Sequence, residues 1–158
     1  MSLHKRISVD ASDKRKIITL VEADSSRVLW DSTLNYLEYK SASDEVEFCA
    51  IIYAMKNYPN VNLEIISDCK SVVDILNNKG KVSQKRNHFV EKIRELCKNR
   101  SVLFKWISRD LNEAGLKQDG YSLDEIRNPD LLKMKKEIRE SVREKYFREK
   151  QRQNKERE

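Results

Sequence analysis

The sequence contains few of the residues that cross-link a chain or bind soft metals. Its 158 residues include three cysteines, Cys49, Cys69 and Cys97, and two histidines that lie far apart. An odd cysteine count without a C-x-x-C pair argues against a disulfide framework and against a cysteine-based zinc site. We therefore expect a cytoplasmic protein with reduced thiols.

Long apolar runs are also absent. No stretch approaches the roughly 18–20 apolar residues that cross a bilayer. The first residues, Met1 to Arg6, contain no apolar segment like that of a signal peptide. We expect no membrane partner. Hydrophobic residues make up 39% of the chain, enough for one core, and charged residues make up 37%, which predicts a segment that stays in solvent.

Positive charge is in excess, but only in one part of the chain. The net charge is +6. Residues 1–132 hold 21 Lys and Arg against 20 Asp and Glu, whereas residues 133–158 hold 11 against 6. A basic tail is compatible with phosphate binding. Because the tail also carries acids, a solvated helix explains its charge equally well.

Three short β-rich runs open the chain, at residues 5–9, 16–22 and 27–30. Short polar connections join them, which predicts an antiparallel meander. Later patterns predict helices at 43–57, 70–77 and around 89–97, strands at 61–66 and 102–107, and a helix start within 110–118. This order predicts an α/β fold with a mixed five-stranded sheet and helices on both faces, within a domain spanning residues 4–127.

A charged helical tail is predicted for residues 128–158. Asn128, Pro129 and Asp130 open the helix, and apolar residues then recur at helical spacing. These are Leu131, Met134, Ile138, Val142 and Tyr146. The stripe suits packing on the same domain or on a second copy, so self-association through this helix is a hypothesis. Residues 151–158 have no apolar side chain and are predicted to be frayed or disordered.

Three acidic residues occupy related places in the predicted fold. Asp10 ends the predicted first strand, Asp68 ends the fourth, and Glu47 lies in the first turn of the first helix. Ligands of α/β sheets gather at strand ends and nearby helix N-termini. Three carboxylates meeting there would repel one another unless a cation joined them. Oxygen ligands select hard ions, so the pattern predicts a site for Mg²⁺ or Mn²⁺.

At these positions the sequence resembles the ribonuclease H family, including the ribonuclease H domains of reverse transcriptases. Four segments carry the resemblance: Ile7–Ser12, Glu47–Met55, Ile65–Val73 and Trp106–Ala114. It covers residues 6–119. It implies the ribonuclease H-like fold and a two-metal endonuclease that cuts the RNA strand of RNA–DNA hybrids. Asp10, Glu47 and Asp68 would then be catalytic metal ligands.

The fourth carboxylate of the family has no clear counterpart. An Ala-Asp pair usually follows the asparagine that matches Asn112, whereas this chain has Ala114-Gly115 one residue early, so that Leu116 stands at the position of the acid. Asp119 lies one helical turn beyond Gly115 and is the predicted fourth catalytic and metal-binding residue. The alternatives are Asp110 and a position left empty.

Other departures concern nucleic-acid contacts. Ala11 replaces the glycine that usually follows the first Asp, Ser43-Asp44 stands where the family often has paired asparagines, and no counterpart of the mobile histidine of some members is found. An acid-free basic run lies between two predicted helices, near the hybrid-binding surface that the family topology implies. The predicted nucleic-acid-binding residues are Ser12, Ser43, Lys79, Lys81, Lys85, Arg86, Arg109 and Asn112.

Several of these residues have plain structural interpretations. Arg109 suits a phosphate contact or a pair with Asp110 or Glu113, and exposed lysines between helices need no function. Trp106 lies in an apolar strand and is predicted to belong to the core. Cys49 and Cys69 are predicted to be small buried hydrophobes.

Two other functions compete with hydrolysis of RNA–DNA hybrids. Loss of the fourth carboxylate and of the hybrid-contacting asparagines is typical of a catalytically weak or inactive module that binds nucleic acid or protein. An interaction role centred on the tail is the third hypothesis. Proofreading-type exonuclease chemistry is disfavoured, because it needs an acid two residues after Asp10, where this chain has Ser12.

Overall fold

The computed structural model describes residues 4–31 and 43–157, without the side chains of Trp30, Asp31 and Ser43. The chain forms two compact units, Met1–Gly120 and Tyr121–Glu158. The functional division predicted at residues 127 and 128 stays a prediction.

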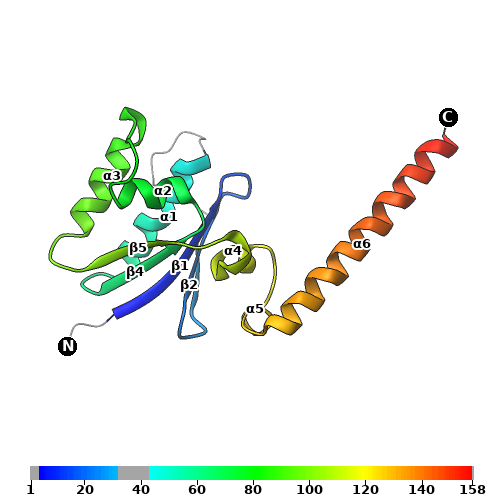
Figure 1. Cartoon of the computed structure of the whole chain (residues 1–158), viewed down its shortest axis with the longest axis horizontal. Helices are drawn as coiled ribbons and strands as arrows, with labels where there is room; N and C mark the ends of the chain where they lie inside the picture. The colour runs from blue at the N-terminus through cyan, green and yellow to red at the C-terminus, as the bar shows by residue number, and fades with distance from the viewer. Residues whose placement is uncertain (1–3, 32–42, 158) are drawn as a thin grey trace. The chain divides into compact units, whose positions relative to one another are not determined.

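Three antiparallel strands begin the first unit (Figure 1). They are β1 (His4–Ser12), β2 (Ile17–Glu22) and β3 (Val28–Asp31). β1 runs two residues past Asp10, so the prediction that Asp10 ends the strand is wrong. The reason is that β2 continues to pair with β1 as far as Ser12 opposite Ile17.

Helical crossovers add two parallel strands to the other edge of β1. The elements are α1 (Ser43–Asn57), β4 (Asn62–Ser67), α2 (Lys70–Leu76), α3 (Gln84–Leu96) and β5 (Val102–Trp106). The sheet order is β3-β2-β1-β4-β5, with β4 parallel to both β1 and β5. The predicted mixed five-stranded sheet is therefore confirmed.

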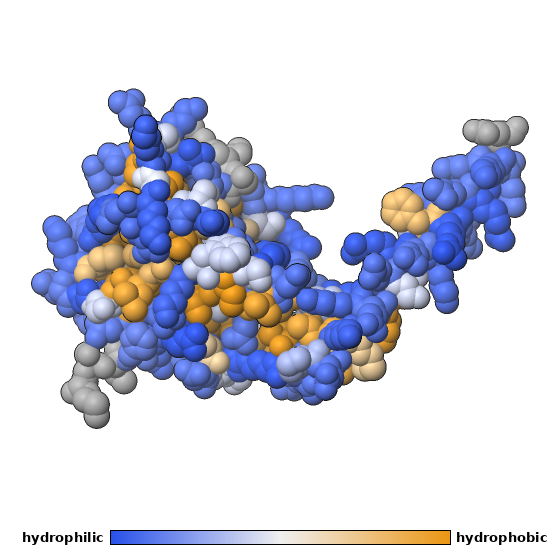
Figure 2. Space-filling view, in the orientation of Figure 1, coloured by the Kyte–Doolittle hydropathy of each residue, from blue (hydrophilic) through white to orange (hydrophobic). Residues whose placement is uncertain are grey.

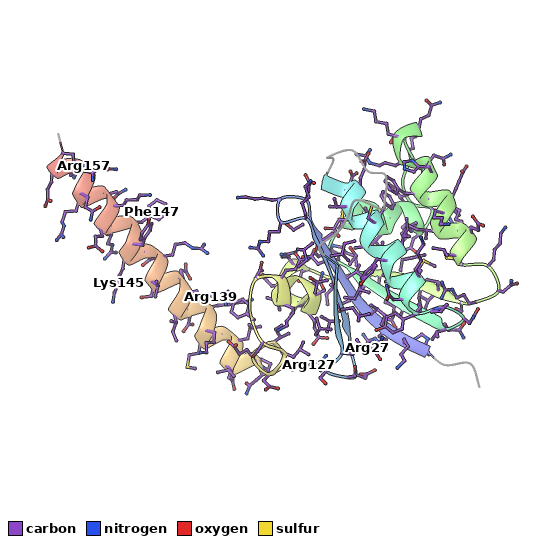
Figure 3. All side chains as sticks on the ribbon, turned by 180° about the vertical axis from the view of Figure 1, so that it is seen from behind. Arg27, Arg127, Arg139, Lys145, Phe147 and Arg157 are labelled. Carbon is purple, nitrogen blue, oxygen red and sulfur yellow. The ribbon has the colours of Figure 1, made fainter. Side chains whose placement is uncertain are left out.

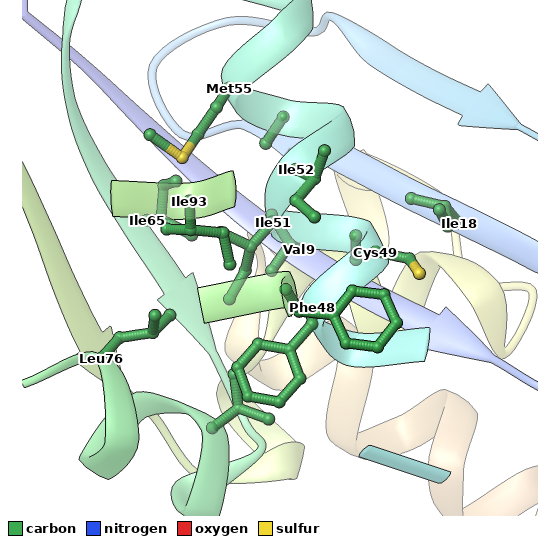
Figure 4. Close-up of a cluster of buried hydrophobic side chains, with 14 of the residues drawn as sticks. Val9, Ile18, Phe48, Cys49, Ile51, Ile52, Met55, Ile65, Leu76 and Ile93 are labelled. Atoms are coloured by element: carbon green, nitrogen blue, oxygen red, sulfur yellow. The ribbon is translucent and has the colours of Figure 1, made fainter. Parts of the chain in front are cut away.

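The main core lies between the sheet and α1, which also packs on α2 and α3. Figure 4 shows Phe48, Ile51, Ile52 and Met55 of α1 among apolar side chains of the strands and of α3. Phe48 stacks on Phe89 of α3, with ring centroids 5.8 Å apart. Burial of this apolar face stabilises the unit and holds the start of α1 close to β1.

A short helix covers part of the opposite face of the sheet. After β5 come η2 (Arg109–Leu111) and α4 (Glu113–Gln118), and α4 packs against β1 and β2 (Figure 1). The side chain of Asn112 caps α4 by accepting a hydrogen bond from the backbone N–H of Ala114. Two faces of the sheet therefore carry helices, as predicted.

Trp106 is not a core residue, contrary to the prediction. It is 51% exposed, although its indole Nε1 donates a 3.0 Å hydrogen bond to the backbone oxygen of Asp68. The reason is topological. Among the described strands β5 lies at the edge of the sheet and pairs with β4 alone, so an apolar strand sequence did not imply burial on both sides.

The second unit contains α5 (Leu123–Ile126) and α6 (Pro129–Glu156). Ser122 and Glu125 form a reciprocal capping box at the start of α5. The side chain of Asn128 caps α6, and Figure 3 shows Lys145 and Phe147 extending away from its axis. Figure 2 shows the visible face of α6 as mostly hydrophilic, with isolated apolar side chains.

The predicted fraying of residues 151–158 is wrong for most of that segment, because α6 is helical as far as Glu156. The segment is made of Gln, Arg, Lys, Asn and Glu. Most of these residues favour helices, and oppositely charged neighbours three and four residues apart support one another. Over the described ranges, no helix is both long enough and apolar enough to cross a membrane.

Candidate metal centre

The register of two parallel strands places two of the predicted acids together. β1 and β4 pair until Ser8 lies opposite Ile66. Asp10 is two residues beyond Ser8, and Asp68 is two residues beyond Ile66. Both therefore lie at the end of the sheet at which β4 finishes, on or just beyond neighbouring central strands. Glu47 arrives from α1, in its second turn rather than the predicted first turn, and α1 packs directly on β1.

The three carboxylates form one compact group. One oxygen of each of Asp10, Glu47 and Asp68 lies within 4.8 Å of the others. Asp10 is 1% exposed and Glu47 is 8% exposed. One oxygen of each, Oδ1 of Asp10 and Oε2 of Glu47, is buried and has no hydrogen-bond partner within the described part of the chain. Buried carboxylate oxygens without a partner are costly unless a cation satisfies them.

Burial and mutual repulsion raise the pKa values of Glu47 and Asp10. Burial, followed by the charges of Asp10 and Asp68, raises the pKa of Glu47 to about 9. Burial also raises the pKa of Asp10 to about 6, although the charge of Arg109 acts in the opposite direction. A bound divalent cation would favour the ionised forms of both. The donor set, which is all oxygen and partly orphaned, therefore fits a hard ion such as Mg²⁺ or Mn²⁺.

Arg109 enters the group from η2. Its Nη1 donates to Oδ2 of Asp10 at 2.5 Å and to Oδ2 of Asp68 at 3.2 Å. Its Nη2 donates to Oδ1 of Asp119 at 3.4 Å. Burial alone would lower the pKa of Arg109, but these carboxylates raise it above its ordinary value. The sequence analysis paired Arg109 with phosphate, Asp110 or Glu113, and it did not predict contacts with Asp10, Asp68 or Asp119.

Asn112 and Trp106 hold Asp68 in position. Asn112 is fully buried, and its Nδ2 donates to the backbone oxygen of Val9 at 3.0 Å and to Oδ2 of Asp68 at 3.1 Å. The indole of Trp106 donates to the backbone oxygen of the same aspartate. Asn112 therefore orients the site, and its burial does not suit the predicted direct contact with nucleic acid.

The candidates for a fourth carboxylate lie differently. Asp119 caps the C-terminal end of α4, has a 39% exposed side chain, and reaches the site through Arg109. Asp110 is exposed on η2. Among the described residues, neither joins the compact group of three. Leu116, where the family pattern places its acid, is buried.

Five of the predicted nucleic-acid-binding residues lie away from the three carboxylates or at the turn after β1, and their surroundings differ. Lys79, Lys81 and Lys85 are exposed. Arg86 forms an ion pair with Asp44, with Nε 2.6 Å from Oδ2, and so is held by α1. Ser12 accepts a hydrogen bond from the backbone N–H of Arg15 in the turn after β1.

Ser43 is the first residue of α1, and its side chain lies outside the described part of the chain.

Gly115 is a site residue that sequence reasoning missed. A Cβ at this position would lie 2.9 Å from Nη1 and 3.0 Å from Cζ of Arg109. The available signal was a glycine inside a short helix, where glycine is disfavoured by about 1 kcal/mol relative to alanine. That signal says a close approach exists, but it does not say which side chain approaches.

Comparison with known structures identifies ribonuclease H domains that share this fold. The N-terminal RNase H domain of Rv2228c from Mycobacterium tuberculosis has a TM-score of 0.57 and 17% identity, covering 73% of this chain and 95% of that one. RNase H1 from Halobacterium salinarum has a TM-score of 0.53 and 14% identity, covering 73% and 98%. LC11-RNase H1, solved in complex with an RNA/DNA hybrid, has a TM-score of 0.53 and 15% identity, covering 70% and 88%.

Sequence comparison places the chain in one family. A comparison with curated proteins finds no match. The family model described as reverse transcriptase-like matches residues 11–115, about two thirds of the chain. That span contains Glu47, Asp68, Arg109 and Gly115. The match and the shared fold agree with the family resemblance found in the sequence, and the chain is a member of the reverse transcriptase-like, ribonuclease H-like family.

Proposed function

We propose that this chain is a divalent-metal-dependent endonuclease that hydrolyses the RNA strand of RNA–DNA hybrids. The observation that carries the proposal is the convergence of Asp10, Glu47 and Asp68 within 4.8 Å at one edge of a ribonuclease H-like sheet. The hybrid bound to LC11-RNase H1, a protein of the same fold, supports the choice of substrate.

The residues of the site suit this reaction. Glu47, Asp10 and Asp68 would hold the Mg²⁺ or Mn²⁺, and Asn112 and Trp106 keep Asp68 in place. When bound, the metal would activate the attacking water and stabilise the leaving oxygen, as in the two-metal mechanism that the family resemblance implies. In that proposal Asp119 completes the site, and its 39% exposure leaves its side chain accessible to metal or substrate.

The nucleic acid would be held by its backbone. Lys79, Lys81 and Lys85 are exposed on the connection between α2 and α3 and at the start of α3. Contacts between lysine and phosphate recognise charge and shape and carry little sequence information. We therefore expect binding of hybrids with little sequence preference and with affinity that falls as salt rises.

One observation favours a different function. The family position for the fourth acid is the buried Leu116, and Arg109 already forms ion pairs with Asp10 and Asp68. A module that binds nucleic acid or protein on the same fold, with weak or no catalysis, is the alternative. The two proposals differ in whether hydrolysis depends on Asp10.

The deciding experiment is cleavage of an end-labelled RNA–DNA hybrid by the full chain in Mg²⁺ and, separately, in Mn²⁺. We expect cleavage of the RNA strand, reduced at least about 100-fold in Asp10→Asn, because a metal ligand is removed. Asp24→Asn is the matched control, since Asp24 is an exposed acid in the turn between β2 and β3. It should cleave like the unaltered chain.

Two outcomes would count against the hydrolase. Cleavage that survives in Asp10→Asn would point to a contaminating nuclease. Binding of the hybrid without cleavage in either ion, by a folded protein, would favour the binding module.

A further inference from the structure

A positive side chain already lies among the acids of the candidate metal centre. The single Nη1 of Arg109 bridges Oδ2 of Asp10 and Oδ2 of Asp68, and Nη2 of the same guanidinium reaches Asp119. A planar guanidinium with five N–H donors suits such bridging, because several carboxylates can accept from it at once. In this arrangement Arg109 supplies one positive charge that Asp10 and Asp68 share.

Gly115 makes room for this guanidinium. A Cβ at Gly115 would lie 2.9 Å from Nη1, 3.0 Å from Cζ and 3.2 Å from Nε of Arg109, and something would have to shift. Gly115 is a buried residue in the middle of α4 and is not among the positive-φ residues. Freedom of the backbone therefore does not explain a glycine there, whereas the close approach of Arg109 does.

The two oxygens of Asp10 have different surroundings. Oδ2 accepts from Arg109, whereas Oδ1 is buried without a hydrogen-bond partner. Oε2 of Glu47 is also buried without a partner. The oxygens without a hydrogen-bond partner thus belong to Asp10 and Glu47, whereas the oxygens that accept from Arg109 belong to Asp10 and Asp68. Arg109 therefore balances charge on one side of the group, and the buried oxygens of Asp10 and Glu47 lie on the other.

We propose that Arg109 is a built-in second cation, so that the site binds one divalent ion, held by Asp10 and Glu47 together with Asp68. The proposal rests on the metal site of the proposed function and replaces one of the two divalent ions of the family's mechanism by Arg109. Three ionised carboxylates carry three negative charges, which one divalent ion and one guanidinium balance. A second divalent ion would leave the site with net positive charge and would repel Arg109 unless the side chain moved away.

The proposal also accounts for the missing fourth acid. A second divalent ion needs further oxygen ligands, because Mg²⁺ keeps six-coordinate oxygen geometry. The position that carries this acid in the family pattern is the apolar Leu116, which is 5% exposed. Where the second cation is a guanidinium, no further carboxylate is needed at that position. Arg109 is thereby a positioning and charge-balancing residue for Asp10 and Asp68.

The test is the stoichiometry of Mn²⁺ binding to the full chain, followed by electron paramagnetic resonance during titration into the millimolar range. We expect one ion per unaltered chain. Arg109→Met should bind two, because the oxygens of Asp10, Asp68 and Asp119 that accept from the guanidinium become available and water completes the shell of the second ion. Arg109→Lys should still bind one, since it keeps the charge.

Arg15→Met is the matched control. It also removes one positive charge near Asp119, at a distance of 4.0 Å, but the ion pair recorded for it does not include Asp10 or Asp68. It should bind one ion, as the unaltered chain does. If Arg109→Met does not fold, Arg109→Gln, which also removes the charge but keeps a polar side chain, decides the question.

Two ions bound by the unaltered chain, or one ion bound by both Arg109→Met and Arg109→Gln, would overturn the proposal. The readout is independent of catalysis. A chain that binds two ions and cleaves hybrids would refute the inference and leave the proposed function intact. A chain that binds one ion without cleaving hybrids would support the inference and refute the proposed function.

Discussion

Glu47 is a carboxylate buried beside two others at the edge of the sheet. Its pKa is raised from 4.5 to about 9, first by burial and then by Asp10 and Asp68. A carboxyl whose pKa is raised by folding binds its proton more tightly in the folded chain. Folding therefore takes up a proton between pH 4.5 and about 9, and the metal-free protein loses stability as pH rises through that window.

We expect Glu47→Gln to stabilise the metal-free protein at pH 8 by about 1–3 kcal/mol, because a neutral amide replaces a carboxyl that resists ionisation. At pH 5, where Glu47 keeps its proton in the folded chain, the effect should be small. The measurement is urea unfolding in the presence of a chelator at both pH values. Glu95→Gln, which changes an exposed acid on α3, should have little effect. A Gln variant less stable at pH 8 would contradict the assignment.

At the scale of elements, Arg100 joins the ends of two helices. Its Nη1 donates to the backbone oxygen of Tyr58 at 2.6 Å, its Nη2 to that of Met55 at 3.3 Å, and its Nε to that of Leu96 at 2.8 Å. The last carbonyls of a helix have no partner within the helix and carry negative partial charge. One guanidinium thus satisfies the C-terminal ends of α1 and α3 and helps to hold α1, which carries Glu47.

We expect Arg100→Ala to lower the free energy of unfolding by about 2–3 kcal/mol, because several part-buried carbonyls lose a charged donor. Arg100→Lys should recover only part of this, since an ammonium cannot reach both helix ends as a planar guanidinium does. Arg94→Ala is the control, because Arg94 donates to the exposed Asn78. It should cost less than about 0.5 kcal/mol. Equal losses at both arginines, measured by urea unfolding, would argue against the bridging role.

At the scale of the whole molecule, the question is how much the second unit contributes. α6 exposes five large apolar residues, Met134, Ile138, Val142, Tyr146 and Phe147. The carboxylate group and the main apolar core belong to the first unit. The functional domain of residues 4–127 and self-association through α6 are therefore separate proposals, and one truncation tests both.

We expect a chain ending at Arg127 to keep the melting temperature of the full chain within about 4 °C, or about 1 kcal/mol, and to keep its Mn²⁺ site. If α6 associates, light scattering should give more chains per particle for the full chain than for the truncated chain. A truncated chain that fails to unfold cooperatively would place part of the functional domain beyond residue 127. Equal oligomeric states would remove α6 as an interface.

Much of the architecture could be read from local pattern. Alternating and helical spacings of apolar residues predicted the five strands and the crossovers, because side-chain periodicity reflects which face of an element is buried. The order of those elements and the motifs around Asp10, Glu47 and Asp68 predicted the α/β fold and the family, and both are confirmed. The meeting of the three acids was predicted from the order of the strands and the first helix, although β1 continues two residues past Asp10.

Contacts between residues far apart in the sequence could not be predicted from these local patterns. Arg109 lies 99 residues from Asp10 and 41 from Asp68, and its nearer neighbours Asp110 and Glu113 were the natural expectation. Trp106 had an apolar strand around it, yet its exposure depends on β5 being the edge of the sheet. Local sequence reports the face that an element presents. Which side chain fills the space opposite that face, as Arg109 does over Gly115, depends on how elements far apart in the chain pack in three dimensions.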